Sequence, residues 1–190
     1  MEQIAEKKKA ILDTTLELIK EHGFHGTPMS LVAKKAGVAA GTIYHYFESK
    51  DELICEVFSY IMQMVTAAIN KGDVEGMPYK ARFFNLWLNL YHFYEANPNV
   101  LVFFEQFVNS PYNAIIGDNC QDKIRTHLDR FMALGVEEGH LRPVNPQVLS
   151  VLVMGNVITT AKIIRLRPGQ ISEEELLQIR EIIWDGMSAR

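Results

Sequence analysis

The chain contains 190 residues, of which 48% are apolar and 22% are charged, a composition typical of a globular protein. Its two cysteines, Cys55 and Cys120, are too few for a disulfide-stapled secreted scaffold or a cysteine-rich zinc module. The net charge is −4, with +1 on residues 1–50 and −5 on residues 51–190. This balance argues against a protein that coats nucleic acid over its whole surface, and it leaves room for a small DNA-facing module on an acidic body.

Apolar residues recur at helical spacing along the whole sequence, and no convincing strand alternation interrupts them, which predicts an all-α fold of about nine helices. The first helix is expected over about 7–22, ended by Gly23. Thr27 is expected to cap a short second helix, with Pro28 at its first helical position. These features predict three N-terminal helices, at about 7–22, 29–36 and 40–46.

The later helices are also marked by caps and breakers. A capping box at Ser49 predicts a fourth helix that continues to about Asn70. Further helices are expected over 79–96, over 99–109, over about 113–139 with a possible break near Gly117, from Asn145-Pro146 to about Arg167, and from a second capping box at Ser172 to the end.

Residues 143–161 form a stretch of 19 residues without a charge, the length of a membrane span. The stretch also contains Asn145, Gln147, Asn156 and two threonines, so we interpret it as a helix covered on two sides, by its own domain and by a partner. Acidic residues near the N-terminus argue against a signal peptide. The expected location is the cytoplasm, with no membrane partner.

The most informative pattern lies at about 28–47, where two short helices are joined by a glycine turn. Ala33 is small enough to let the two helices approach, and Gly37 can supply the positive φ that the turn needs. Val32 and Ile43 are expected to pack between the helices. The pattern predicts a helix-turn-helix, although an ordinary helical hairpin would show the same spacing, so the spacing alone leaves DNA binding and simple packing open.

The residues around this motif resemble the signature of the tetracycline-repressor (TetR) family of transcriptional regulators. The resemblance rests on Gly41-Thr42-Ile43-Tyr44-His45-Tyr46-Phe47, on Ser49-Lys50-Asp51-Glu52-Leu53, and on the preceding Gly23, Thr27, Ala33 and Gly37. It covers about residues 5–65, a third of the chain. The remainder matches only in helix count and in its two apolar terminal helices.

The resemblance implies a DNA-binding domain over 5–65 and an effector-binding and dimerisation domain over 66–190. It also implies a homodimeric repressor that binds a palindromic operator through its third helix and is released by a small molecule. The residues expected to contact DNA are Thr27, Ala39, Ala40, Gly41, Thr42, Tyr44, His45, Tyr46 and Lys50.

The chemistry of these positions agrees with that expectation. Gly41 allows close approach to the sugar-phosphate backbone, while Thr42 and His45 can hydrogen-bond to base edges or phosphates. Ala39 and Ala40 depart from the family pattern, which often has a capping hydroxyl and a polar or basic residue there. The third helix therefore carries few base-reading groups, and DNA shape is expected to contribute to specificity.

Ten aromatic residues are concentrated between positions 83 and 112, in the region that encloses the effector site in the family. Core packing explains several of them, but rigid rings with polar tips also line ligand cavities well. We predict an apolar or aromatic effector in contact with Trp87, Tyr91, Phe104 and Phe107.

The last two helices are expected to form the homodimer. The uncharged helix carries apolar side chains around most of its circumference, so a monomer would leave one face exposed to water. Gly155 and Thr159, four residues apart, would allow a second copy to approach closely.

No pattern typical of an enzyme accompanies these motifs. The six histidines form no HExxH pair, and no glycine-rich phosphate loop or serine nucleophile elbow occurs. The chain is therefore expected not to be an enzyme and to use no cofactor and no metal. Two alternatives stay open, a redox-responsive regulator acting through Cys55, and an enzyme that uses the aromatic pocket, which has little support.

Overall fold

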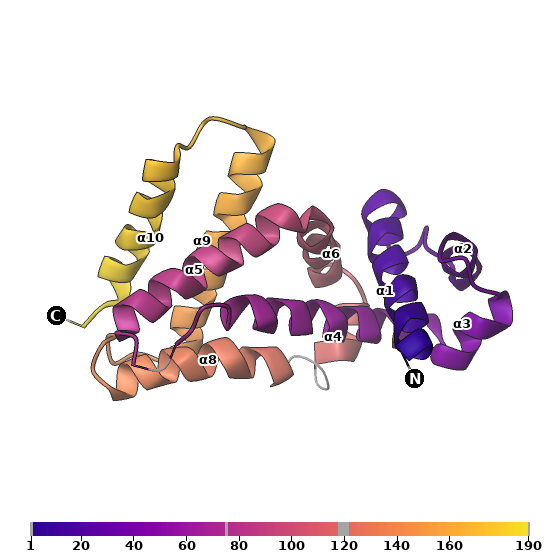
Figure 1. Ribbon diagram of the computed structural model, residues 1–190, viewed down its shortest axis with the longest axis horizontal. Coiled ribbons are helices and arrows are strands. Elements are labelled where there is room, and N and C mark those ends of the chain that lie inside the picture. The colour runs from indigo at the N-terminus through magenta and orange to yellow at the C-terminus, as the bar shows by residue number, and fades with distance from the viewer. Residues whose placement is uncertain (1, 75, 118–121, 190) are drawn as a thin grey trace. The chain divides into compact units, whose positions relative to one another are not determined.

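The computed structural model describes residues 2–74, 76–117 and 122–189, and the regular elements in these ranges are all helices, apart from one isolated pairing of Leu141 with Ser188. The ten helices, labelled where there is room in Figure 1, are α1 (Glu2–His22), α2 (Met29–Lys35), α3 (Ala40–Tyr46), α4 (Lys50–Ile69), α5 (Tyr79–Ala96), α6 (Pro98–Val108), α7 (Tyr112–Gly117), α8 (Asp122–Glu137), α9 (Pro146–Leu166) and α10 (Glu173–Met187). The all-α prediction is confirmed.

Most helix ends follow from the residues expected to define them. Gly23 and Gly37 adopt φ values of +70° and +68° directly after α1 and α2, the left-handed conformation that glycine takes at low cost. The Asn145 side chain accepts a hydrogen bond from an amide in the first turn of α9. Ser172 and Glu175 form the complete capping box of α10, with bonds of 3.2 and 2.8 Å.

The predicted cap of α2 is wrong. Thr27 is only 2% exposed, and its hydroxyl donates a 2.8 Å hydrogen bond to the carbonyl of Gly23. Pro28 occupies the N-cap position of α2 and provides no side-chain cap. A buried hydroxyl needs a partner, and the carbonyl at the end of α1 supplies one four residues back.

Two further boundaries were open to question in the sequence. At the start of α4, the Ser49 hydroxyl accepts from the Glu52 amide at 3.1 Å, but the Glu52 carboxylate accepts from the Glu48 amide rather than from Ser49, so the reciprocal half of the box is shifted by one residue. The break considered near Gly117 in the segment expected over about 113–139 is confirmed, because α7 ends at Gly117 and α8 begins at Asp122.

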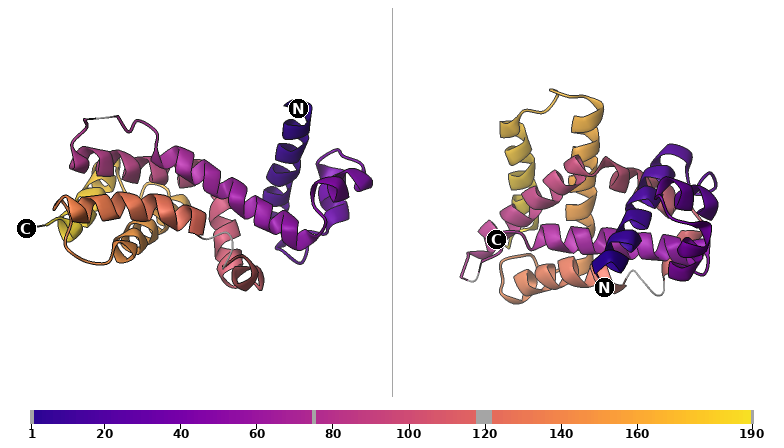
Figure 2. Two further views of the ribbon diagram at one scale, coloured as in Figure 1. Left: turned by 90° about the horizontal axis from the view of Figure 1, so that it is seen from below. Right: turned by 45° about the vertical axis from the view of Figure 1, so that its right-hand side comes forward.

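The chain divides into two compact units. One comprises Met1–Gln63 and Pro98–Gln121, and the other comprises Met64–Asn97 and Asp122–Arg190. Helix α4 contributes residues to both and runs without interruption from Lys50 to Ile69 (Figure 2).

In the first unit, α1 packs against α2 and α6, and α2 packs against α3. Phe24, just after α1, contacts Phe103 of α6 and Tyr112 of α7, with ring centroids 5.5 and 5.1 Å apart. Gln106 of α6 donates a 3.1 Å hydrogen bond to the carbonyl of Ile19. Helices α6 and α7 therefore stabilise the same unit as the helix-turn-helix, although they lie far along the sequence.

In the second unit, α9 packs against α5 and α8, while α10 packs against α5 and α9 (Figure 1). Trp87 of α5 is fully buried, and its indole Nε1 donates to the Asn156 side chain of α9 at 3.0 Å. Helices α4 and α9 are long and apolar enough to span a membrane by length and composition, a test that the core helices of soluble proteins also pass.

Candidate nucleic-acid interface and body cavities

Helices α2 and α3 form a tight helix-turn-helix. Ala33 is 2% exposed, and its carbonyl accepts from the Val38 amide at 3.0 Å across the turn at Gly37. Val32 and Ile43 are completely buried between the helices, as predicted. The small residue and the positive-φ glycine thus bring the two helices together and fix which face of α3 points outward.

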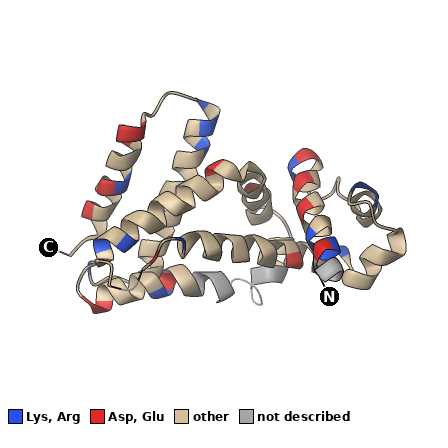
Figure 3. Cartoon of the chain, viewed as in Figure 1, with Lys and Arg blue, Asp and Glu red and all other residues tan. Residues whose placement is uncertain are grey.

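The outward face of α3 is built from Ala40, Gly41, Tyr44 and His45, which are all exposed. Residues three and four apart share a face of a helix, so Gly41, Tyr44 and His45 form one surface. Tyr44 is 56% exposed, so its ring and hydroxyl are accessible to a partner. Helix α3 carries no Lys, Arg, Asp or Glu (Figure 3).

Nothing in the described part of the protein requires glycine at position 41. Its φ is not positive, and a Cβ placed there would meet no atom within 4 Å. Glycine within a helix costs about 0.5–1 kcal/mol relative to alanine. The absence of a side chain at Gly41 therefore has no folding role within these residues and suits close approach by something outside the chain.

The other residues predicted to contact DNA differ in how exposed they are. Ala39 is exposed and caps α3 without a side-chain bond, while Thr42 and Tyr46 are half-buried. Thr27 is buried before α2, as described above. Lys50 begins α4, and its ammonium donates to the carbonyl of Phe24, where partial burial lowers the pKa of its side chain.

Several lysines near this module are engaged by carboxylates of the same unit. The Lys8 ammonium lies 2.6 Å from the Glu56 carboxylate, and the Lys9 ammonium lies 2.9 Å from the carboxylate of Asp13, one turn further along α1. Lys35 lies 3.2 Å from Glu21. These exposed pairs are weak, so the lysines can exchange a carboxylate for a phosphate at small cost.

The four aromatic residues predicted to bind an effector fall into two pairs. In the second unit, Trp87 and Tyr91 stack with ring centroids 6.0 Å apart, and burial together with Glu95 raises the pKa of Tyr91 to about 12. In the first unit, the rings of Phe104 and Phe107 pack against the ring of Phe58, with centroids 6.1 and 5.0 Å from it.

These aromatic residues are mostly core residues. Trp87, Tyr91 and Phe107 are at most 4% exposed, and Phe104 is half-buried. The cavities described below are lined by other residues, so ligand contact by these four remains a prediction.

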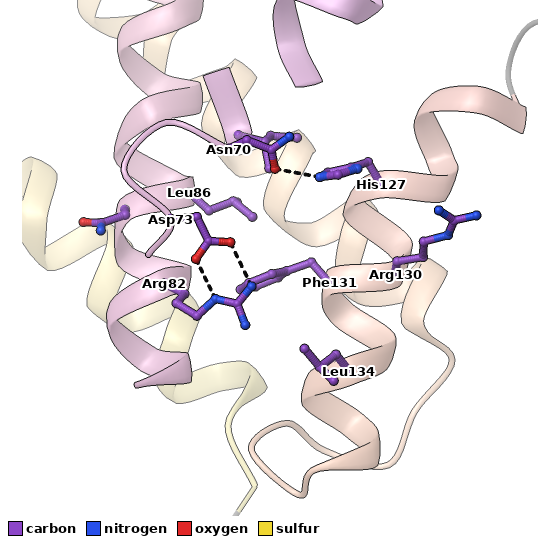
Figure 4. Close-up of a pocket in the computed structure, with 10 residues that line it drawn as sticks. Asn70, Asp73, Arg82, Leu86, His127, Arg130, Phe131 and Leu134 are labelled. Carbon is purple, nitrogen blue, oxygen red and sulfur yellow. Dashed lines mark hydrogen bonds and ion pairs between the residues drawn. The ribbon is translucent and has the colours of Figure 1, made fainter. Parts of the chain in front are cut away.

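The described part of the second unit contains several cavities. A cavity of about 280 Å³ lies between α4, α8 and α9 and is lined mainly by apolar side chains, together with Asp129 and Ser150. A cavity of about 220 Å³ lies between the α4–α5 connection, α5 and α8 and is polar on one side (Figure 4). Sequence reasoning missed both, because their residues come from three separate segments with no common spacing.

The polar side of the smaller cavity centres on an ion pair. Arg82 donates from Nε and Nη2 to the two carboxylate oxygens of Asp73 at 2.7 and 2.8 Å, and these bonds hold the pKa of Asp73 below its ordinary value (Figure 4). His127 lies 2.7 Å from the Asn70 side chain. Arg130 is exposed on α8, and among the described residues no carboxylate pairs with it.

The two cysteines give no support to redox sensing. Cys55 is half-buried on α4, and Cys120 lies outside the described residues. Within the ranges that the structure describes, no group of three His, Cys, Asp or Glu side chains could hold a metal ion.

An apolar stripe runs along the outward face of α9. Its exposed members recur every three or four residues and are Val148, Leu152, Gly155, Thr159, Ile163 and Leu166. Leu166 is 75% exposed and Leu152 is 50% exposed. A continuous apolar face of this kind marks a contact surface.

Comparison with known proteins places both parts of the chain in one family. Residues 11–57 match the family model described as bacterial regulatory proteins of the tetR family, and residues 78–188 match the tetracyclin repressor-like C-terminal domain. An uncharacterised HTH-type transcriptional regulator of Haemophilus influenzae is 28% identical over 174 residues, covering 92% of this chain and 91% of the relative.

Solved structures agree along nearly the full length. A TetR-family transcriptional regulator from Vibrio parahaemolyticus is 30% identical, with a TM-score of 0.83, and the match covers 97% of this chain and 100% of that one. A TetR-family regulator from Haemophilus influenzae is 26% identical with a TM-score of 0.85, covering 99% and 100% of the two chains.

Proposed function

Because the chain belongs to the TetR family of DNA-binding transcriptional regulators, we propose that it is a homodimeric, cytoplasmic repressor that binds a palindromic operator and is released by a small apolar or aromatic effector. We assign the DNA contacts to the residues predicted from the sequence, with α3 in the major groove. The effector contacts are proposed at Trp87, Tyr91, Phe104 and Phe107.

The exposed face of α3 is the observation that carries the DNA contact. Gly41, Tyr44 and His45 share this face, and the glycine has no folding role within the described residues. A glycine without a folding role, beside a hydroxyl and an imidazole, suits a helix that lies against a DNA groove.

Selection of bound sequences from a random DNA pool tests this function directly. The purified protein at moderate salt is expected to enrich a palindrome whose half-site centres lie about 34–36 Å apart, or a multiple of this distance. Enrichment of a single unrepeated half-site would contradict the dimeric mode of binding. Weak binding of all sequences, with a steep loss of affinity on adding salt, would contradict sequence recognition by α3.

Replacing Gly41 by Ala should change stability and DNA affinity in opposite directions. The variant is expected to be more stable by about 0.5–1 kcal/mol, because alanine loses less backbone entropy and the new Cβ meets no protein atom. Operator affinity is expected to fall roughly tenfold, since a methyl group forced into a close contact costs about 1–3 kcal/mol. Thermal unfolding and operator titration measure the two effects.

Gly186→Ala is the matched control. Gly186 is exposed on α10, and a Cβ there also meets no atom within 4 Å. It should therefore gain stability without losing operator affinity, and light scattering checks that the variant is still dimeric, since α10 belongs to the proposed dimer interface. Equal DNA affinities for the two variants would remove Gly41 from the interface.

A further inference from the structure

The cavity between the α4–α5 connection, α5 and α8 combines an apolar floor with a cationic rim. Ile69, Leu86, Phe131 and Leu134 supply the apolar surface. Its volume of about 220 Å³ is below the range of drug-sized sites, so a small molecule of one ring or a short chain suits it.

The charged side chains that line this cavity are unequal in number. Arg82 and Arg130 contribute two positive charges, and Asp73 contributes one negative charge. Arg82 uses two of its five N–H donors on Asp73, and its guanidinium lies 5.4 Å from the centre of the Phe131 ring. Figure 4 shows its third nitrogen turned away from Asp73. The rim therefore offers donors to an anion.

The Asp73–Arg82 pair is accessible to a competing anion. The side chains of Asp73 and Arg82 are 32% and 27% exposed. A bidentate pair with one carboxylate has the same geometry as a pair with another, so exchange replaces like with like. Asp73 also lies on the connection after α4 rather than inside a helix, and it can move away without breaking a helical turn. Asp73 thus holds Arg82 in the way that the carboxylate of a ligand could.

We propose that this cavity binds a small organic carboxylate with an aromatic or aliphatic body, whose carboxylate takes the place of Asp73 on Arg82. The apolar part of the ligand lies on Phe131, Leu86 and Leu134, and the exposed Arg130 side chain turns to the rim to contact the anion. This site is distinct from the effector contacts proposed at Trp87, Tyr91, Phe104 and Phe107, and binding of the carboxylate does not rest on the proposed function.

Binding is measured on the full-length protein without DNA, using benzoate as the probe and benzamide as its uncharged analogue. Titration followed by NMR of the arginine Nε–H signals should show saturable shifts with benzoate at about millimolar concentration and none with benzamide. Asp73→Asn is expected to tighten benzoate binding about three- to tenfold, because it removes the internal competitor for Arg82. Arg82→Gln should abolish saturable binding, and Arg130→Gln should weaken it.

Asp129→Asn is the control variant. It distinguishes the effect of freeing Arg82 from the effect of removing one negative charge from the protein. Asp129 lies on α8 and lines the neighbouring cavity, so its replacement alters the net charge equally without freeing Arg82. Equal tightening by both variants would overturn the exchange of carboxylates, as would equal binding of benzamide or the absence of saturable benzoate binding in both wild type and Asp73→Asn. If Arg82→Gln fails to fold, the Asp73→Asn and Asp129→Asn comparison still decides.

A separate operator titration distinguishes this inference from the proposed function. Benzoate binding with the expected variant pattern, but without any operator, would support the site and contradict the repressor. Operator binding without benzoate binding would support the repressor and contradict the site.

Discussion

A glutamate at Leu152 is expected to convert the proposed dimer into monomers and to weaken operator binding at least 100-fold. Leu152 is 50% exposed in the middle of the apolar stripe of α9. In a two-fold interface the same residue from each subunit lies near the axis or faces the same surrounding patch, so the change buries two uncompensated charges. A monomer contacts only one half-site and loses the gain in affinity that comes from linking two contacts.

Val108→Glu is the control for this variant. Val108 is 61% exposed at the end of α6, outside the stripe, and should leave both the mass in solution and the operator affinity unchanged. Light scattering at micromolar concentration and operator titration read out the two properties. A Leu152→Glu protein that remains dimeric would place the homodimer contact elsewhere on the chain.

Replacing Trp87 by Ala is expected to destabilise the protein by about 3–5 kcal/mol, the largest effect on stability that we predict. Trp87 is completely buried in the second unit, and its indole N–H is bonded to Asn156 of α9. The substitution leaves a cavity and also an unpaired side-chain oxygen on Asn156. Denaturant unfolding at one fixed protein concentration measures the loss, since dimerisation makes stability depend on concentration.

Trp87→Phe divides this loss into its two parts. Phenylalanine keeps most of the ring packing but not the donor to Asn156, so we expect a smaller loss of about 1–3 kcal/mol. If both variants unfold like the wild type, the residue does not pack in the core as described. If Trp87→Phe unfolds like the wild type while Trp87→Ala does not, packing of the ring rather than the bond to Asn156 accounts for the loss.

The sequence predicted the helices well wherever a helix end is set by one residue. Gly23 and Gly37 end helices because glycine adopts positive φ cheaply, and Ser172 starts α10 because a hydroxyl and a carboxylate three residues apart satisfy two amides. Such local preferences operate over a few residues and can be recognised without a structure. They also specified the helix-turn-helix, where Ala33 and Ile43 pack as expected.

Expectations failed where a distant or competing partner decides the outcome. Thr27 has the chemistry of a cap, but its hydroxyl is bonded to Gly23, which no helix-start rule anticipates. The contact of α6 with α1 depends on Gln106 and Ile19, which are 87 residues apart. The hydrogen bond from the indole of Trp87 to Asn156 joins residues that are 69 positions apart, and no local pattern predicts it.

The cavity proposed to bind a carboxylate could not be predicted from the sequence, for the same reason. Asp73, Arg82 and Arg130 come from a connection and two helices, and single charged residues on helices are usually solvated. Only their arrangement around an apolar floor distinguishes them from other surface charges. Tertiary structure is therefore required to find this site, although it is not required to recognise the DNA-binding module.

An uncharged α3 on an acidic protein also affects how many molecules a cell needs. Attraction of lysines and arginines to phosphates supplies most non-specific DNA binding, and a bacterial chromosome offers millions of competing sites. Because α3 carries no lysine or arginine, attraction to phosphates at the proposed interface is left to the lysines that flank it, and random chromosomal sequence should retain less of this protein than of a regulator with a basic third helix. More copies then stay free to search, so fewer per cell are needed to keep an operator occupied.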